Sequence, residues 1–374
     1  MKVYIATYYQ YDNYGTRLQN FALCQSVQAL GAQPITLAIR DKRGILVRFM
    51  QDIFSSFPLI CSRQRIWLNN RIKRNKFSSF NGRLCLQVMG YGDINKLNFD
   101  EAIAVAGSDQ IWSPKHIIKN AKEKELYFLR FAPREKRFAY APSFGTEELC
   151  DELRDMYQTY ISDFKQLSVR ETAGQKIIKE LTGMEALVLP DPTFLLNSDE
   201  WRKAVSALGM ELFEGNYVLT YFLSEQSKVL WENINNYAKE RKLRVVCIAG
   251  NQYKKGTLVP APDEFVKLVE GAKAVFTDSF HGSVFSIIMQ TPFVVFRRSD
   301  VDQLSRIDTL LQKYELTKAF LENENVAVNY DAIFIEENFT RAGNIMAQER
   351  QKGLDYLKKI IQSCKYDEKR EKYV

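Results

Sequence analysis

Residues 276–296 read "FTDSFHGSVFSIIMQTPFVVF", and the order of apolar and polar residues in this stretch decides the fold. An apolar strand, "KAVFTD" at 273–278, ends at a polar turn that contains His281, one of only two histidines in the chain. The segment "GSVFSIIMQ" at 282–290 is interpreted as a helix, and "PFVVF" at 292–296 as a second strand. A strand, a helix and another strand in succession predict a βαβ unit with parallel strands.

The same alternation of strands and helices runs along most of the chain. Strand candidates in the first half include "VYIAT", "PITLAI" and "EAIAVAG", and "NYVLTYFL" and "LRVVCIAG" repeat the pattern in the second half. Between the halves, "LLNSDEW" offers Asn197 or Ser198 as a helix cap. We therefore predict an α/β protein with two doubly wound domains, at 1–197 and 198–335, followed by a long C-terminal helix and a charged tail at 336–374.

Composition sets limits on the class of protein. The chain has 374 residues, of which 46% are hydrophobic, so there is ample apolar material for packed cores. No stretch reaches the roughly 18 continuous apolar residues that a membrane span needs. The first residues, "MKVYIATYYQYDNYG", become polar too early for a secretory signal peptide, so we expect a cytoplasmic protein.

Cysteine and histidine spacing gives no sign of a metal site. The six cysteines form no CxxC pair, and two histidines are too few to complete a ligand set. We expect free thiols in a reducing compartment and no bound metal. The sequence also lacks a Walker A or GxGxxG motif, so it carries no signature of a nucleotide cofactor.

Polar clusters follow several predicted strands, where doubly wound sheets bind their ligands. Asp109 in "GSDQIW" and Asp278 in "TDSFHG" are carboxylates in such loops, and each could act as a base or shape its own turn. His281 could transfer a proton near neutral pH, bind a phosphate at the start of a helix, or simply fill the turn. Gly282 beside it would let a ligand approach the backbone closely.

Taken together, these clusters resemble the polysaccharide pyruvyl transferase family. The matching pieces occur in the family's order between about residues 12 and 312; they are "NYGTRLQNFAL", "VAGSDQIW", "YAPSFG", "SVRE", "LPDPTFLL", "TDSFHGSVFSIIMQTPFVVF" and "SRIDTLL". The resemblance implies a GT-B-like architecture, in which two Rossmann-like domains face each other across a cleft. It also implies transfer of pyruvate from phosphoenolpyruvate onto two hydroxyls of a sugar, forming a cyclic ketal in a surface polysaccharide or its lipid-diphosphate-linked precursor.

The resemblance assigns roles to particular residues. His281, Asp278 and Asp109 become the catalytic candidates. The donor, with its phosphate and carboxylate, is expected on the C-terminal domain, and its candidate partners are Arg170, Arg306, Ser279 and Gly282. The acceptor is expected on the N-terminal domain, and its candidate partners are Asn13, Gly15, Gln19, Ser108, Trp112 and Phe144. No cofactor is implied, because phosphoenolpyruvate is itself the donor substrate. In contrast, Asp191 in "LPDPT" is interpreted as a turn residue before Pro192.

Most of the net charge of +7 lies in one segment, which does not share the resemblance. Ten basic and two acidic residues fall between Arg40 and Lys76, so the rest of the chain is close to neutral. Nucleic acid is not expected as a partner, since no recognition fold accompanies the charge. A solvated helix face and docking at the anionic inner face of a membrane both remain open.

Two other functions compete with pyruvyl transfer. A glycosyltransferase on the same scaffold would need a nucleotide-sugar site in the second domain, around "IAGNQY" and "DSFHG". A non-enzymatic glycan-binding protein is the third candidate, although His281 and Arg170 argue against it.

Overall fold

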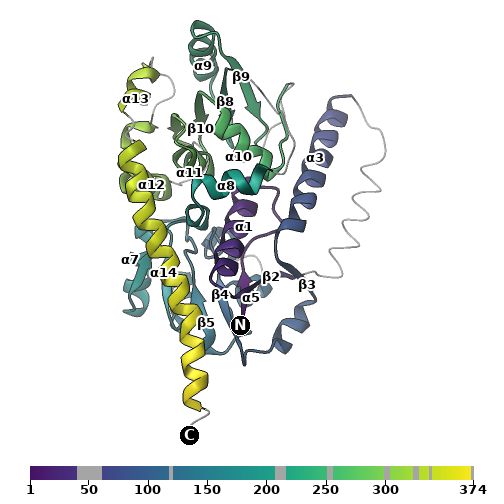
Figure 1. Ribbon diagram of the computed structural model, residues 1–374, viewed down its shortest axis with the longest axis vertical. Coiled ribbons are helices and arrows are strands. Elements are labelled where there is room, and N and C mark those ends of the chain that lie inside the picture. The colour runs from purple at the N-terminus through teal and green to yellow at the C-terminus, as the bar shows by residue number, and fades with distance from the viewer. Residues whose placement is uncertain are drawn as a thin grey trace. The chain divides into compact units, whose positions relative to one another are not determined.

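A computed structural model describes residues 1–39, 61–117, 121–206, 216–250, 256–298, 304–322, 328–336 and 339–371 (Figure 1). The chain forms two compact units, each assembled from separate stretches. The first unit comprises Met1–Leu68, Asn81–Leu195 and Glu349–Val374, and the second comprises Asn69–Phe80 and Leu196–Gln348. The main division therefore falls close to "LLNSDEW", while the C-terminal segment contributes to both units.

A five-stranded parallel sheet forms the centre of the first unit. Its strands lie in the order β3-β2-β1-β4-β5, with bounds Leu86–Met89, Gln33–Ile39, Lys2–Ala6, Ala102–Ala106 and Arg137–Ala139. Every residue of β4 is buried, as is typical of a parallel strand covered on both faces. Two shorter strands, β6 (Leu167–Val169) and β7 (Ala186–Val188), pair in parallel beside it.

Alternate residues of each strand point to opposite faces of this sheet, and apolar residues point to both faces. Each face therefore packs against its own apolar core. Tyr4 and Ala104 belong to the apolar core on one face, and Val3 and Ile103 to the core on the other. The second core also contains residues of α1 (Tyr14–Ala29) and of the long C-terminal helix α14 (Phe339–Glu371). The remaining helical elements of this unit are α4 (Pro114–Ile117), α5 (Ala121–Tyr127), α6 (Asp151–Ile161), α7 (Thr172–Thr182), and the 3-10 turns η1 (Asn81–Arg83), η2 (Tyr91–Lys96), η3 (Arg134–Lys136) and η4 (Pro192–Leu195).

The second unit repeats the design. Its parallel strands lie in the order β12-β11-β10-β8-β9, with bounds Phe320–Leu321, Phe293–Phe296, Ala274–Thr277, Tyr217–Tyr221 and Arg244–Ile248. Its helices are α3 (Cys61–Phe80), α8 (Ser198–Ser206), α9 (Lys228–Glu240), α10 (Pro262–Gly271), α11 (Phe280–Met289), α12 (Leu304–Lys313), the turn η5 (Thr317–Ala319) and α13 (Tyr330–Glu336). Only the second half of α3, from Asn69 onward, belongs to this unit. β9 lies on one side of β8, and β10, the next strand along the chain, lies on the other side of β8. The strand order therefore reverses between β8 and β10, and doubly wound sheets bind their ligands at such a point.

The decisive stretch folds as predicted. β10 is followed by α11 and then by β11, and Val275 pairs with Phe293 in parallel register. The helix begins at Phe280, two residues earlier than the sequence suggested, because Ser279 caps it through a hydrogen bond from the Gly282 amide. His281 therefore lies in the first turn of a helix rather than in a loop.

Other segments differ from the prediction. The strand β3 was not predicted, because two of its four residues are exposed and its apolar pattern is weak. The long C-terminal helix predicted from Glu336 is confirmed as α14, and a short helix that was not predicted, α13, precedes it. Residues 40–60 of the basic segment lie outside the described residues. At the end of that segment, Lys76 pairs with Glu264 at 2.7 Å, and Phe77, the next residue, is fully buried. No helix among the described residues combines the length and apolar character that a membrane crossing requires.

The cysteine thiols offer a test of the first unit. Cys24, Cys85 and Cys150 form no disulfide, and a hydrogen bond from the buried Cys24 thiol lowers the pKa of Cys85 to about 7. A hydrogen bond to Glu152 instead raises the pKa of the exposed Cys150. Because the thiolate is the nucleophile, alkylation of Cys85 by iodoacetamide is expected to rise with pH around a midpoint near 7, below the midpoint of Cys150. Peptide mass spectrometry after timed labelling would measure both, and the reverse order would contradict the Cys24–Cys85 contact.

Candidate functional site

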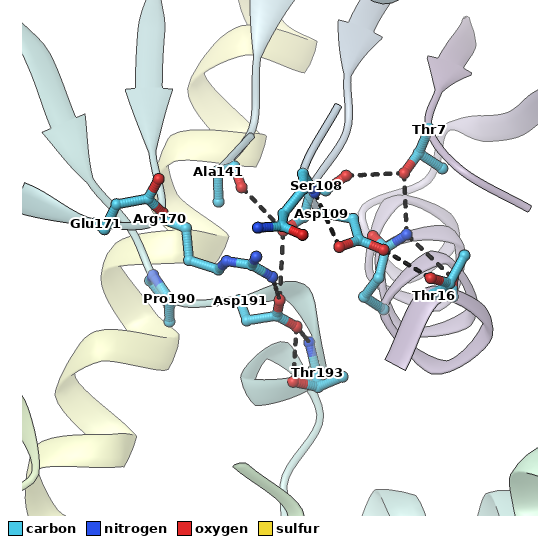
Figure 2. Close-up of polar contacts among 12 residues, drawn as sticks. Thr7, Thr16, Ser108, Asp109, Ala141, Arg170, Glu171, Pro190, Asp191 and Thr193 are labelled. Atoms are coloured by element: carbon cyan, nitrogen blue, oxygen red, sulfur yellow. Dashed lines mark hydrogen bonds and ion pairs between the residues drawn. The ribbon is translucent and has the colours of Figure 1, made fainter. Parts of the chain in front are cut away.

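Polar groups come together at the carboxyl ends of several strands of the first unit, from the five-stranded sheet and from the β6–β7 pair beside it. Figure 2 shows them around Asp191, which follows β7. Ser108 and Asp109 come after β4, Ala141 after β5, and Arg170 after β6. The sequence placed these residues in strand-end loops, but gave no indication that Asp191 would lie at the centre of the group.

Arg170 and Asp191 form a buried ion pair. The Arg170 Nη1 donates to Asp191 Oδ2 at 2.6 Å, and the two side chains are 3% and 0% exposed. Burial alone would lower the pKa of Arg170, but the carboxylates of Asp191, Asp109 and Glu171 outweigh it and raise the pKa. Asp191 also accepts hydrogen bonds from the Thr193 amide and hydroxyl and, at 3.4 Å, from the Ser108 hydroxyl. The turn interpretation of Asp191 was therefore incomplete, because its carboxylate also neutralises the buried arginine.

Asp109 lies at the carboxyl edge of the five-stranded sheet with its backbone in the left-handed region, at φ 74°. Its Oδ2 accepts a 2.7 Å hydrogen bond from the Thr16 hydroxyl on α1, and its Oδ1 accepts one from the Gln110 amide. Ala141, at the end of the next strand, also has a positive φ of 49°. Non-glycine residues in this region are strained by about 1–3 kcal/mol each, and such strain clusters at functional sites. Asp109 is only half-buried, so its carboxylate can reach a ligand.

Two further charged groups at this edge escaped sequence reasoning. Glu171 is fully buried, and its Oε1 accepts hydrogen bonds from the Phe144 and Gly145 amides, which fixes the loop after β5. Arg17, in α1, lies 3.7 Å from Asp12, and burial lowers the pKa of its guanidinium to about 10, so it stays charged at neutral pH. Their positions in "SVRE" and "NYGTR" were the available signal.

Several predicted acceptor residues do not face a ligand. Trp112 and Phe144 are fully buried and pack edge to face at 5.6 Å in the apolar core, which corrects the prediction that they stack on a sugar. Gln19 and Ser108 are also fully buried: Gln19 donates to Thr7 and Ser108 to the Ala141 carbonyl. These four residues make buried contacts that stabilise the strand-end loops.

Asn13 and Gly15, which follow β1, lie at the N-terminus of α1. Asn13 caps α1 by accepting a hydrogen bond from the Thr16 amide at 3.4 Å, and it remains half-buried. Gly15 is buried in the first turn of that helix. Contact of either residue with an acceptor stays a prediction.

In the second unit, Asp278 holds two loops together. Its carboxylate accepts hydrogen bonds from the Leu223 amide, the Ser224 amide and hydroxyl, and the Gln226 side chain. Burial raises the pKa of Asp278 despite these bonds, and the residue is 0% exposed. The prediction that Asp278 is a base for the sugar hydroxyl is corrected, because its oxygens are inaccessible and occupied by the loop after β8.

His281, Phe280 and Arg306 form a cluster at the start of α11. The rings of Phe280 and His281 meet edge to face at 5.1 Å, and the Arg306 guanidinium lies 5.6 Å from the centre of the Phe280 ring. His281 is 8% exposed and Arg306 is 6% exposed. The catalytic candidate His281 and the predicted donor ligand Arg306 are thus brought together beside the N-terminus of a helix, which favours anions. Ser279 serves this cluster as the helix cap.

Gly282 is required by packing rather than by ligand access. A Cβ at this position would lie 2.4 Å from the Thr277 hydroxyl, which donates to the Tyr221 carbonyl at 2.6 Å and accepts from the Ser279 amide at 3.0 Å. This corrects the prediction that Gly282 clears space for a ligand. The Gly282→Ala variant is expected to lose about 1–3 kcal/mol of unfolding free energy, since the added methyl displaces Thr277. Urea unfolding would measure this, with Gly82→Ala as the control because nothing lies within 4 Å of its Cβ position. Equal stabilities of the two variants would contradict the packing account.

Comparisons with known proteins decide the family. A family model described as polysaccharide pyruvyl transferase matches residues 13–300, which is more than half of the chain. The chain belongs to the polysaccharide pyruvyl transferase family. This family consists of transferase enzymes, as the ordered motifs indicated. No protein of curated function matches the sequence of this chain significantly.

Solved structures similar to this chain define its fold class. It is 10% identical to the UDP-GlcNAc 2-epimerase of Neisseria meningitidis bound to UDP-GlcNAc, with 98% and 100% of the two chains covered and a TM-score of 0.50. It is 12% identical to UGT89C1 of Arabidopsis thaliana complexed with UDP-L-rhamnose, with 96% and 98% covered and a TM-score of 0.51. These likenesses confirm a GT-B-like α/β fold with two doubly wound parallel sheets and a long C-terminal helix.

Proposed function

We propose that this protein moves pyruvate from phosphoenolpyruvate onto two hydroxyls of one sugar, forming a cyclic ketal, without a cofactor. The sugar would belong to a surface polysaccharide or its lipid-diphosphate-linked precursor. Family membership supports pyruvylation of a polysaccharide in general. The observation that carries the finer proposal is the cluster of His281 and Arg306 at the start of α11, beside the point where the strand order reverses.

This cluster suits the donor because phosphoenolpyruvate carries a phosphate and a carboxylate on one small skeleton. The Arg306 guanidinium supplies a permanent positive charge and several N–H donors. The first turn of α11 adds the positive end of a helix dipole. His281 can donate a proton in its charged form and accept one in its neutral form, so it can serve either as the general acid or as a phosphate partner.

The reaction divides into protonation, addition and ring closure. Protonation of the donor methylene carbon makes C2 electrophilic, and a sugar hydroxyl then adds to C2. The bond between C2 and the phosphate oxygen breaks, and inorganic phosphate leaves. A second hydroxyl of the same sugar attacks C2, and this step is favoured because it is intramolecular. The protons lost by the two hydroxyls balance the proton added to carbon and the proton taken up by the departing oxygen.

Asp109 is our candidate for the base that accepts a hydroxyl proton. Its carboxylate is half-buried at the carboxyl edge of the first sheet, and the Thr16 hydroxyl and Gln110 amide orient it. The strained backbone at Asp109 agrees with a position held for function rather than for stability. Arg170, locked onto Asp191, would act here by fixing the edge, and its direct contact with the donor stays a prediction.

A glycosyltransferase is the second candidate, favoured by one observation. Both structural neighbours described above were solved with a UDP-sugar. On this scaffold, the same helix start that suits phosphoenolpyruvate could bind a diphosphate.

Phosphate release separates the two functions. Purified protein would be incubated with phosphoenolpyruvate and a panel of galactosyl and mannosyl glycosides. We expect release of inorganic phosphate that depends on both substrates, with a product heavier than the acceptor by one pyruvate less one water. Turnover of UDP-sugars, with phosphoenolpyruvate left intact under every acceptor, would instead support the glycosyltransferase.

We also propose that the basic segment 40–76 docks the protein on the anionic face of a membrane from the cytoplasm. The concentration of positive charge in this segment supports it. Cosedimentation with vesicles containing phosphatidylserine, compared with neutral phosphatidylcholine vesicles, tests the contact, and equal recovery with both would contradict it.

A further inference from the structure

The second unit contains a pocket of about 500 Å³ that the proposed donor site does not use, and Ile248 and Gly250 of "IAGNQY" are among its lining residues. It lies on the β9 side of the sheet, between that strand, α9 and the loop after β8. The residues that decide its chemistry are Phe222, Ser224, Glu225, Gln226, Trp231 and Asn235. Its volume falls within the range of small-molecule sites.

The lining of the pocket favours a neutral, hydroxyl-rich ligand. Among the described residues that line it, Glu225 carries the only charge, and its carboxylate would repel a phosphate or carboxylate on a ligand. The side-chain amides of Gln226 and Asn235 can both donate to and accept from sugar hydroxyls. The aromatic wall formed by Trp231 and Phe222, whose rings meet edge to face at 5.8 Å, offers an apolar surface to the C–H face of a pyranose.

The pocket is rigidly connected to the loop that carries His281. Ser224, which lines the pocket, donates to Asp278 through both its amide and its hydroxyl, and Asp278 precedes α11 by two residues. Gln226 also reaches Asp278 at 3.3 Å. Asp278, although too buried for catalysis, thus fixes the wall of this pocket against the start of α11.

We propose that this pocket is a binding subsite for a neutral pyranose unit of the glycan acceptor. Its assignment to the acceptor rests on the proposed function, whereas the affinity for a sugar does not. Glu225 accepts hydrogen bonds from sugar hydroxyls, and the ring of Trp231 packs on the apolar face of the sugar. A glycan that extends from the reacting sugar would bind more tightly through this subsite. The subsite would also fix which sugar of the glycan lies at the reacting position.

Ligand titration of the full chain tests the subsite. Methyl glycosides of galactose, mannose, glucose and N-acetylglucosamine, and separately UDP, would be titrated against the wild type, Glu225→Gln and Trp231→Phe while tryptophan fluorescence is recorded. We expect at least one glycoside to bind, and its affinity to fall about tenfold in Glu225→Gln through loss of a charge-assisted hydrogen bond. Trp231→Phe is expected to keep the packing on Phe222 but to lose most of the fluorescence response.

Glu232→Gln is the matched control, because Glu232 is an exposed carboxylate on α9 that does not line the pocket. Its affinity should equal that of the wild type. The proposal is overturned if no glycoside binds, if Glu225→Gln binds as tightly as Glu232→Gln, or if UDP binds and loses affinity in Glu225→Gln.

The transfer assay distinguishes failure of the subsite from failure of the proposed function. Glycoside binding that is weakened by Glu225→Gln, without any use of phosphoenolpyruvate, would uphold the subsite and reject pyruvyl transfer. Pyruvyl transfer whose acceptor KM is the same in Glu225→Gln and the wild type would uphold the reaction and reject the subsite.

Discussion

The Asp191→Asn variant is expected to lose about 3–5 kcal/mol of unfolding free energy, because it leaves the buried Arg170 guanidinium without its closest counter-charge. The asparagine keeps the size of the side chain, so the loss would report charge rather than a cavity. Denaturant unfolding followed by circular dichroism measures this change.

Two controls isolate the effect of burial. Glu185→Gln removes one partner of the exposed Lys179–Glu185 pair in the same unit and should cost less than about 1 kcal/mol. Replacing both members of the buried pair, Arg170→Met with Asp191→Asn, should cost less than the sum of the single variants, because the two losses share one interaction. A cost for Asp191→Asn no larger than that for Glu185→Gln would contradict the central place of this ion pair.

The His281→Gln variant is expected to lower kcat/KM about 10²–10⁴-fold if His281 transfers the proton, which is the range that positioned acid–base groups contribute. The same variant separates the two roles that the structure leaves to this histidine. An acid–base role predicts a lower kcat and loss of one titrating limb from the pH–rate profile. A phosphate-binding role predicts a higher KM for phosphoenolpyruvate with both limbs retained.

The second histidine supplies the matched control. His116 lies in α4 of the first unit, is exposed and packs edge to face near Tyr8 at 6.2 Å. His116→Gln should keep the wild-type rate and pH profile. Unchanged activity of His281→Gln, in a chain that folds normally by circular dichroism, would remove His281 from the site.

Periodicity predicted the parallel sheets because their strands are continuous apolar runs. Residues 102–106 and 274–277 are buried throughout, and no other element type accounts for short apolar runs between helices as well. The strand β3 was missed for the opposite reason, since a sheet-edge strand with exposed residues leaves little pattern to read.

The site was harder to predict because its important contacts join residues far apart in sequence. Sequence position placed Arg170 and Asp109 at strand ends, but the partner of Arg170 follows another strand 21 residues later. Similarly, Asp278 looked like a catalytic carboxylate until its bonds to a loop 54 residues earlier became visible. Trp112 and Phe144 show the same limit, since an aromatic side chain beside a polar motif can point into the core. A strand-end motif indicates which edge a residue lies on, but not which way its side chain points.

Pyruvyl transfer carried out in D₂O tests the central claim most directly. The proposed chemistry adds one solvent proton to the methylene carbon of phosphoenolpyruvate and releases inorganic phosphate. Proton NMR and mass spectrometry of the product should therefore show a ketal whose methyl group carries one deuterium, formed in equal amount to the phosphate released. Glycosyl transfer from a UDP-sugar, with phosphoenolpyruvate recovered unlabelled and intact, would contradict the account.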